Sequence, residues 1–345
     1  MRAVINHYDN SGVSYWRLWI QAKYLERRGW DVYRFDDNKP FITVEDWEKI
    51  LPGTDIFINQ GLDNPEFLAL TMAMRDEYKM PIVVDIDDDM YDISPSSPAY
   101  QHYYPGSPVV ELAEEYIRDA DLITTTTDTL AELYSGLNNN IKVLPNVVDP
   151  EDWPDSKPTN GDPIILGWVG SPTHYDDLKL LKRPIAQILR KNKNVKLRVM
   201  GCLPDFWAGH PQIELRNDYA EIRDWPKTMA KLNIDIGLAP LVTRPFNLGK
   251  SNLKWIEYSA LQIPGVYSNM GEYKKTIVHN ETGLVSNSDL EWEYNIQKLI
   301  DNESLRKSIG KQAKQKVLKD FNIVSRIKDW EDVYRSAINT FATAK

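Results

Sequence analysis

The chain has 345 residues, 42% of them hydrophobic and 26% charged, and its formal net charge is −9 at pH 7. This length can supply two domains with separate cores, and the acidic charge makes a nucleic-acid partner unlikely. No stretch approaches the roughly 18 consecutive apolar residues of a membrane-spanning helix, so no transmembrane segment is expected. The single cysteine, Cys202, and a first segment that does not resemble a signal peptide favour a cytoplasmic location.

The first half of the chain alternates β-rich runs with helix-like segments. The expected strands are Ala3–His7, Asp31–Phe35, Asp55–Asn59, Pro81–Ile86, Asp121–Thr124 and Ile141–Leu144. The expected helices are 15–28, ending at Gly29, then Pro65–Tyr78, Val109–Arg118 and Thr129–Tyr134. This alternation predicts a mostly parallel sheet wrapped by helices.

A segment with four prolines, residues 146–163 (NVVDPEDWPDSKPTNGDP), is the best candidate linker. The alternation then restarts. The expected strands are Ile164–Val169, Val195–Met200, Ile234–Ala239, Gly265–Ser268 and Gly283–Ser286, and the expected helices are Asp176–Lys191, Asp224–Leu232, Ser251–Leu261, Asp289–Ile300 and a tail from Glu303. The sequence therefore predicts an α/β protein with two doubly wound, Rossmann-like domains and a ligand site in the cleft between them.

The most informative segment is RPFNLGKSNLKWIEYSALQIPGVYS, residues 244–268. A turn with Asn247 and Gly249 leads into a helix expected to start near Lys250 or Ser251, with Ser251 as its N-cap. Free backbone N–H groups at such a helix start attract an anion, and Lys250 adds a full charge, so a pyrophosphate would fit there. Glu257, two turns further on, can accept hydrogen bonds from two sugar hydroxyls, typically those of a ribose.

Residues 244–268 resemble the donor-binding segment of group-one glycosyltransferases, which have the two-domain GT-B architecture. Three other segments agree with that family: the PN-x-x-D element in 142–153, the strand and glycine turn in 165–181, and the final strand and helices in 272–313. The resemblance implies an acceptor-side domain over residues 1–155, a nucleotide-sugar donor domain over 162–322, and a C-terminal helix, 323–345, that packs back on the first domain.

The resemblance also implies an activity. It is that of a glycosyltransferase, of the hexosyltransferase kind, which moves a sugar from a nucleotide-sugar donor to a glycan, a protein or a small molecule. Retention of configuration is implied, and neither a metal nor another cofactor is expected. The residues implied for the donor site are Gly12, Gly170, Ser171, Arg244, Asn247, Gly249, Lys250, Ser251, Lys254 and Glu257.

The chain departs from the family pattern at two places. Many members carry Glu-x7-Glu, and Glu257 matches the second glutamate, but position 249 is a glycine. Where many members have an arginine and a lysine after the glycine turn, this chain has Ser171 and Tyr175. We therefore expect Lys250, Arg244 and backbone N–H groups to meet the phosphate charge.

An acidic run, VVDIDDDMYD at residues 83–92, ends the fourth expected strand. In the implied architecture Asp87 and Asp88 line the acceptor side, where they orient an acceptor hydroxyl or take its proton. With Lys250 they are the candidate catalytic residues. Asp89 and Asp92 are as readily explained as caps of the following turn. A phosphatase-type pair, Asp85 with Asp87, is disfavoured because that pattern normally opens its domain.

Two alternatives remain open from the sequence. The first is a nucleotide-sugar epimerase on the same fold, and the second is a catalytically silent sugar- or nucleotide-binding protein, which the glycine at position 249 favours. Arg17 fits a solvated helix face as well as a site, and Trp225 fits packing better than stacking on a base. The five histidines show no metal-ligand spacing.

Overall fold

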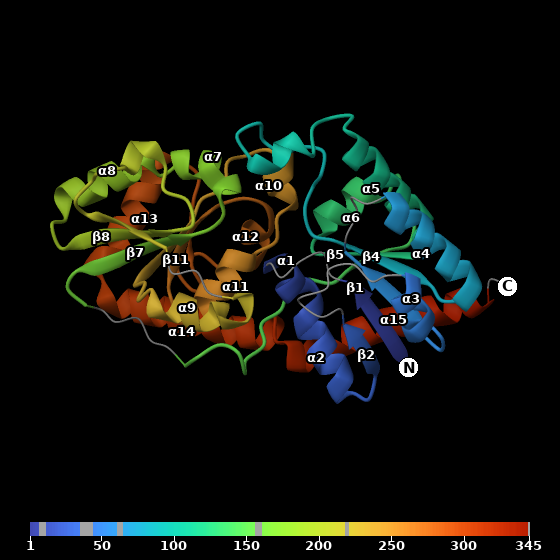
Figure 1. Ribbon diagram of the computed structural model, residues 1–345. Coiled ribbons are helices and arrows are strands. Elements are labelled where there is room, and N and C mark those ends of the chain that lie inside the picture. Colours follow the sequence, from blue (N-terminus) through green and yellow to red (C-terminus); the bar gives the residue numbers. More distant parts are fainter. Residues whose placement is uncertain (7–11, 35–43, 61–64, 156–160, 218–220, 344–345) are drawn as a thin grey trace. The chain divides into compact units, whose positions relative to one another are not determined.

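The structure is a computed structural model that describes residues 1–6, 12–34, 44–60, 65–155, 161–217 and 221–343 (Figure 1). Its contacts divide the chain into two compact units. The first unit comprises Met1–Tyr91, His102–Val147 and Ile323–Lys345, and the second comprises Asp92–Gln101 and Val148–Asn322. The short segment Asp92–Gln101, directly after the acidic run, therefore belongs to the second unit.

Within the described residues, the first unit is built on a six-stranded parallel sheet with the strand order β2-β1-β3-β4-β5-β6. The strands are β1 (Arg2–Asn6), β2 (Asp31–Arg34), β3 (Ile56–Asn59), β4 (Ile82–Ile86), β5 (Leu122–Thr125) and β6 (Ile141–Val143). The helices are α1 (Gly12–Ser14), a π-helical turn (Tyr15–Trp19), α2 (Ile20–Arg27), α3 (Val44–Ile50), α4 (Pro65–Tyr78), α5 (Pro108–Asp119), α6 (Asp128–Tyr134) and α15 (Ile323–Thr343).

Apolar side chains of the helices cover this sheet. One core cluster joins the strands to α3, α4 and α5 through Trp47, Met74 and Ile117. The last helix of the chain, α15, packs along α2 (Figure 1). Its buried Trp330 and Tyr334 explain why this distant segment belongs to the first unit.

In the second unit, again counting only described residues, six parallel strands follow the order β12-β11-β10-β7-β8-β9. The strands are β7 (Ile164–Val169), β8 (Val195–Met200), β9 (Ile213–Arg216), β10 (Ile236–Ala239), β11 (Gly265–Ser268) and β12 (Leu284–Ser286). The α-helices are α7 (Tyr175–Lys179), α8 (Lys182–Lys191), α9 (Trp225–Lys231), α10 (Pro245–Gly249), α11 (Leu253–Ala260), α12 (Gly271–Thr276), α13 (Asp289–Asp301) and α14 (Glu303–Asp320). The 3-10 turns are Pro98–Gln101, Pro172–His174, Asp205–Trp207 and Ile222–Asp224.

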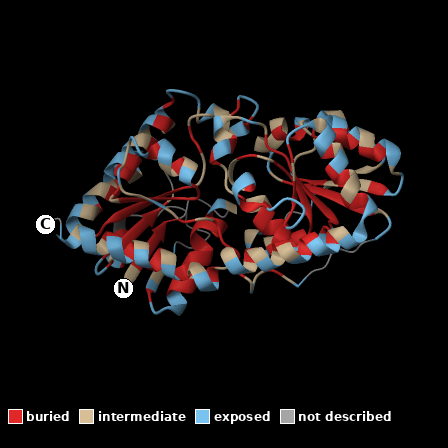
Figure 2. Ribbon diagram, turned by 180° about the vertical axis from the view of Figure 1, so that it is seen from behind, coloured by how far each residue is buried: buried red, intermediate tan, exposed pale blue. Residues whose placement is uncertain are grey.

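Helices cover both faces of this second sheet. Helix α8 packs on α13, and α11 packs on α14 (Figure 1). The strands are buried along most of their length, whereas the helices expose one side to solvent (Figure 2). Both units thus have the helix–sheet–helix layers that the alternating sequence pattern predicts.

Most predicted elements are confirmed, with shifts of one or two residues at their ends. The exception among the strands is β9, which was not predicted; it is a short, partly exposed edge strand and so has no clear apolar alternation. The predicted helix Asp176–Lys191 is interrupted between α7 and α8. The predicted linker is packed at its start, where Val147 and Val148 are fully buried, while residues 156–160 lie outside the described residues.

Candidate functional site

The second unit has its topological switch point between β7 and β10, because the chain leaves β7 toward β8 and β9 and returns on the other side at β10. Ligands of doubly wound sheets bind beyond the carboxyl ends of the strands at such a point. Gly170 directly follows β7, and residues 240–250 follow β10. The predicted donor-site residues of this unit therefore lie on the two loops that flank the switch point and on the helix after them.

Helix α11 packs closely on the two strands that flank the switch point, β7 and β10. The Tyr258 hydroxyl of α11 lies 3.3 Å from the carbonyl oxygens of Gly167 on β7 and Leu238 on β10. A Cβ atom at Gly237 would approach the Tyr258 ring to 2.6 Å, so glycine lets α11 lie close to the sheet. Helix α11 is thereby fixed directly over the switch point.

The start of α11 differs from the prediction. The helix begins at Leu253, and Asn252 rather than Ser251 is its N-cap residue. The Asn252 amide donates to the Thr276 hydroxyl at 3.0 Å instead of capping the helix with its side chain. The predicted N-cap was wrong because a separate short helix, α10, precedes an extended residue, Lys250, and delays the start of α11.

Glu257 is a buried acidic residue of this segment, with 2% of the residue exposed. Its Oε1 accepts the indole N–H of Trp225 at 2.8 Å, and its Oε2 accepts from Lys254 Nζ at 2.8 Å. A carboxylate has about four acceptor sites, so two partners leave capacity for hydroxyl groups. Lys254 and Glu257 were both predicted for the donor site from the sequence, whereas the contact of Glu257 with Trp225 of α9 was not expected.

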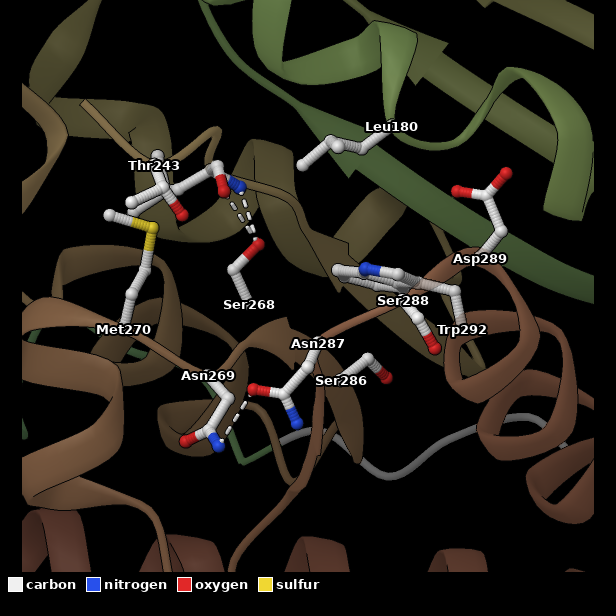
Figure 3. Close-up of a pocket in the computed structure, with 11 residues that line it drawn as sticks. Leu180, Thr243, Ser268, Asn269, Met270, Ser286, Asn287, Ser288, Asp289 and Trp292 are labelled. Carbon is white, nitrogen blue, oxygen red and sulfur yellow. Dashed lines mark hydrogen bonds between the residues drawn. The ribbon is translucent and has the colours of Figure 1, made fainter.

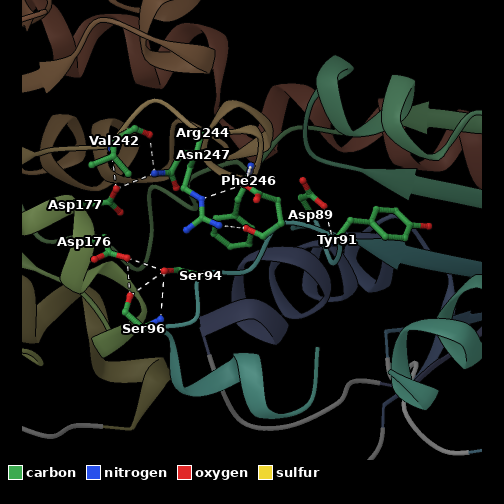
Figure 4. A network of polar contacts seen from close by, with 11 residues as sticks. Asp89, Tyr91, Ser94, Ser96, Asp176, Asp177, Val242, Arg244, Phe246 and Asn247 are labelled. Carbon is green, nitrogen blue, oxygen red and sulfur yellow. Dashed lines mark hydrogen bonds and ion pairs between the residues drawn. The ribbon is translucent and has the colours of Figure 1, made fainter. Parts of the chain in front are cut away.

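Lys250 and Arg244 flank α10 and have different surroundings. The Lys250 ammonium lies 4.4 Å from the centroid of the Phe246 ring. Arg244 Nε donates to Asp92 Oδ2 at 3.0 Å, and the Phe246 N–H donates to the same oxygen at 3.0 Å (Figure 4). The hydrogen bond from Arg244 is the main reason why the pKa of Asp92 is lowered. Arg244 thus anchors the segment Asp92–Gln101, and its role toward phosphate stays a prediction.

Asp177, a residue that the sequence reading missed, connects three parts of the site. Its Oδ1 accepts from the Val242 N–H at 2.8 Å and from the Asn247 amide at 2.7 Å (Figure 4). Its Oδ2 lies 2.8 Å from His174 Nδ1. Asn247 is buried and fully engaged by Asp177 and by the Val242 carbonyl. Its observed contacts therefore position the loop after β10.

The loop after β7 contains the other predicted residues. A Cβ atom at Gly201 would lie 2.1 Å from the carbonyl oxygen of Gly170, so the loops after β7 and β8 are in close contact there. Ser171 is exposed, and its hydroxyl lies 2.5 Å from that of Thr173. Gly249 is buried at the end of α10. The contacts described for Gly170, Ser171 and Gly249 do not show whether these residues bind the donor, so their roles stay predictions.

The neighbouring Asp176 ties the segment Asp92–Gln101 to α7. Its Oδ2 accepts from the hydroxyls of Ser94 at 2.6 Å and Ser96 at 2.5 Å (Figure 4). Its Oδ1 accepts from Lys179 Nζ at 2.6 Å. The bond from Lys179 is the largest cause that holds the pKa of Asp176 well below its usual range. Hydrogen bonds to carboxylates therefore hold the segment Asp92–Gln101 at two places. Arg244 donates to Asp92, and Ser94 and Ser96 donate to Asp176.

The acidic run of the first unit divides into residues with different surroundings. Asp85 is buried and forms two hydrogen bonds with Arg17, at 2.9 and 2.8 Å, and one with the Thr124 hydroxyl at 2.7 Å. This pairing argues against Asp85 as a phosphatase nucleophile. Arg17 is 1% exposed, so the interpretation as a solvated helix face was wrong.

Beyond Ile86 the chain leaves the sheet. The carbonyl groups of Asp87 and Asp88 accept from the Thr126 and Tyr134 hydroxyls, at 3.4 and 2.9 Å, and their side chains are half-buried. Asp89 Oδ1 accepts the backbone N–H of Tyr91 at 2.7 Å (Figure 4). Asp89 therefore has the expected turn-capping role.

Gly12 lies at the switch point of the first unit, between β1 and β3, where it begins α1. Nearby, the side chains of Asn6 and Asn59 hydrogen bond at 2.7 Å across the ends of those strands. Gly12 is thus at the start of the helix after β1, next to the place where a ligand of this unit would bind.

A separate cavity of about 170 Å³ lies beyond β10, β11 and β12 in the second unit (Figure 3). Its polar lining is largely engaged: the Ser268 hydroxyl bonds to the backbone of Leu241, and the Asn269 amide bonds to Asn287 at 3.1 Å. None of the predicted donor-site residues lines it. This cavity is therefore separate from the predicted donor site at the switch point.

Two further observations concern the described residues alone. They contain no group of three or more His, Cys, Asp or Glu side chains arranged to hold a metal ion. None of their helices has both the length and the apolar character needed to cross a membrane.

Several solved structures have the same fold as this chain. A sucrose-phosphate synthase from Thermosynechococcus elongatus matches with a TM-score of 0.69 at 15% identity, covering 98% of this chain and 99% of that one. The Anabaena protein Alr3699/HepE, solved with UDP and glucose, matches with a TM-score of 0.68 at 14% identity, covering 97% and 100%. The likeness confirms the predicted fold class, two Rossmann-like α/β units of the GT-B type.

Sequence comparisons narrow the class further. The profile of a family described as glycosyl transferase-like matches residues 182–332. A capsular polysaccharide biosynthesis glycosyltransferase, CapM, from Staphylococcus aureus is 29% identical over 192 residues, which is 52% of this chain and 47% of CapM. The chain therefore spans about half the length of this curated relative. Together these matches confirm the resemblance to group-one GT-B glycosyltransferases and indicate an enzyme of the glycosyltransferase class.

Proposed function

We propose that the protein transfers a sugar from a nucleoside-diphosphate sugar to an acceptor, and that the second unit binds the donor. The observation that carries the proposal is the group formed by Glu257, Lys254 and Lys250 at the switch point of that unit. A buried carboxylate with spare acceptor capacity suits ribose hydroxyls, and two ammonium groups nearby suit a diphosphate. The UDP in the Alr3699/HepE structure supports a uridine nucleotide as the first one to test.

The proposed chemistry follows from the resemblance and from what the side chains offer. Transfer proceeds with retention and without a metal, and Lys250 together with backbone N–H groups stabilises the leaving diphosphate. Asp87 and Asp88 orient the acceptor hydroxyl or accept its proton. The acceptor is a glycan, a protein or a small molecule. A cytoplasmic location is part of the proposal and rests on the single cysteine.

Incubation with a panel of nucleotide sugars tests the proposal. Release of free nucleotide, faster when mixed glycan acceptors are added, is the expected result. Conversion of the donor to a sugar epimer without any acceptor would favour the epimerase alternative. Binding of nucleotide by calorimetry without any turnover would favour the silent binding protein, and the absence of both binding and turnover would contradict the proposed function.

A further inference from the structure

His174 lies at the switch point of the second unit and has no role in the function proposed so far. It ends the 3-10 turn Pro172–His174 after β7, and 19% of its side chain is exposed. Its ring meets the Trp168 ring edge to face, with centroids 6.2 Å apart and planes at 75°. Together with the contact to Asp177, this packing fixes the orientation of the imidazole.

The contact to Asp177 also sets the tautomer. The Asp177 carboxylate is 4% exposed and already accepts from the Val242 N–H and the Asn247 amide. A carboxylate oxygen beside a histidine ring nitrogen accepts the ring N–H and thereby fixes the tautomer, so His174 Nδ1 carries a hydrogen and donates it to Asp177 Oδ2 at 2.8 Å. The lone pair of the neutral ring is then on Nε2, for which the described residues supply no hydrogen bond.

The charged groups around His174 come from three elements. Asp177 of α7 favours the imidazolium, whereas Lys250, after α10, and Lys254 of α11 oppose it. Burial is the largest influence, and the net result is a lowered pKa of His174. In the empty site the ring is therefore neutral near pH 7, beside the two ammonium groups that we assign to the diphosphate.

A bound diphosphate reverses this balance. Its negative charge offsets the two ammonium groups and favours a positive charge at the imidazole. We propose that His174 is a further donor-site residue, which takes up a proton from solvent when a nucleoside diphosphate binds and donates its Nε2–H to a phosphate oxygen. This inference rests on the proposed function, because it requires the diphosphate beside Lys250 and Lys254.

The proton and electron balance of the step is simple. One proton moves from water to Nε2 and stays there through the reaction. When the bond between the sugar carbon and the phosphate oxygen breaks, its electron pair remains on that oxygen, and the imidazolium N–H stabilises the added charge. His174 thereby supplies a positive charge only while the donor site is occupied.

Histidine titration by NMR tests the proposal, because the chain has only five histidines. The protein is labelled with ¹³C at histidine Cε1, and His174→Asn, whose amide can still donate to Asp177, identifies the His174 signal by its loss. On saturation with UDP, the pKa of His174 should rise by about one unit or more, a tenfold gain in proton affinity. An unchanged or lower pKa in UDP-saturated protein would overturn the inference.

An internal control is available in the same spectra. Burial and Lys298 also lower the pKa of His279, but this residue precedes β12, at the amino edge of the sheet. Its titration should not respond to UDP. A rise of equal size at both histidines would indicate a general effect of the nucleotide and would contradict a specific contact with His174.

A binding measurement separates this inference from the proposed function. UDP affinity of the wild type should fall as pH rises through the bound-state pKa of His174, and this component should be missing in His174→Asn. Identical pH profiles of the two proteins would refute the role of His174 and leave the donor site intact. Failure of the wild type to bind UDP at any pH would contradict the uridine donor itself.

Discussion

Lys254 Nζ lies 2.8 Å from Glu257 Oε2, one helical turn away on α11, and the Glu257 residue is only 2% exposed. Lys254 supplies a positive charge directly to this buried carboxylate and occupies one of its oxygens. The pair therefore orients the free acceptor positions of Glu257. Trp225, on the other oxygen, completes that orientation.

Replacing Glu257 by glutamine keeps the size of the side chain and removes its charge. A lost charged hydrogen bond costs about 1.5–3 kcal/mol, so Glu257→Gln should raise the dissociation constant for UDP by roughly 10-fold to 100-fold. Calorimetry measures this change, with circular dichroism as a test of folding. The control is Glu303→Gln, which breaks a lysine–glutamate pair on the exposed face of α14. Equal UDP affinity of Glu257→Gln and wild type would remove Glu257 from the donor site.

The buried pair Arg17–Asp85 supports the first unit rather than a site. Removing one charged partner leaves the other buried without compensation, which costs about 3–5 kcal/mol. Arg17→Met should therefore lower the free energy of unfolding of this unit by that order, as measured by urea titration. The double variant Arg17→Met, Asp85→Asn should lose less than the sum of the single changes. Strict additivity of the two changes would contradict a direct interaction.

The hydrogen bonds of Glu331 on α15 determine how the stability of the first unit should change at low pH. Its carboxylate accepts from Arg335 at 2.7 Å and from the Trp30 indole at 3.2 Å, and it also pairs with Arg28. These bonds, chiefly that from Arg335, lower the pKa of Glu331 to about 2. Because the folded-state pKa lies below the unfolded one, the stabilisation is complete above the unfolded pKa, about 4.3, and is lost as pH falls toward 2.

The variant Glu331→Gln tests this dependence. Its deficit in unfolding free energy should be constant above about pH 6 and should shrink as pH falls from 4.3 toward 2. Asp329→Asn, which breaks a more exposed pair with Arg326 on the same helix, serves as the control. A deficit of Glu331→Gln that stays constant down to pH 2 would show that the charge of Glu331 does not stabilise this unit.

The sequence predicted the fold well because strands and helices are local patterns. Buried runs such as Ile164–Val169 and the proline that begins α4 are visible in a few consecutive residues. The site was predictable only where it is contiguous, as for Lys254 and Glu257. Trp225, Asp177 and His174 approach it from other elements, and their roles depend on tertiary hydrogen bonds that no short sequence window contains.

The same reasoning explains why the sequence left the role of Arg17 open. A helix that carries one arginine among apolar residues is usually solvated on that side. Here the side chain reaches Asp85 on β4 and the Leu144 carbonyl, both far along the chain, and so becomes buried. Only the parallel sheet, which aligns the carboxyl ends of its strands, brings these partners together.

Metal dependence provides a further prediction. If the leaving diphosphate is stabilised by Lys250 and backbone N–H groups, sugar transfer should be unchanged in excess EDTA. The assay measures nucleotide release before and after dialysis against EDTA. Activity that is lost in EDTA and restored by manganese or magnesium would overturn the metal-free mechanism, and the acidic run would then be the first place to search for the ligands.

The last prediction separates the donor from the acceptor function. Lys250 follows α10 in the second unit, and Lys250→Ala should weaken UDP binding because a cation beside the diphosphate is lost. The control is Lys298→Ala, which removes the same charge from the far end of α13, where Lys298 bonds to Asn280 at 2.7 Å. The control should bind UDP as the wild type does. Equal weakening by both variants would indicate a general charge effect instead of a local contact.

Asp88, in the first unit, should show the opposite behaviour. Asp88→Asn keeps the shape of the side chain and removes its basicity, so sugar transfer should slow or acceptor affinity should fall. UDP affinity should stay nearly unchanged, because an acceptor-side carboxylate has no contact with the diphosphate. A carboxylate that faced the diphosphate would repel it, and its neutralisation would tighten UDP binding. Much tighter UDP binding by Asp88→Asn, or transfer at the full wild-type rate, would therefore exclude Asp88 from the acceptor side.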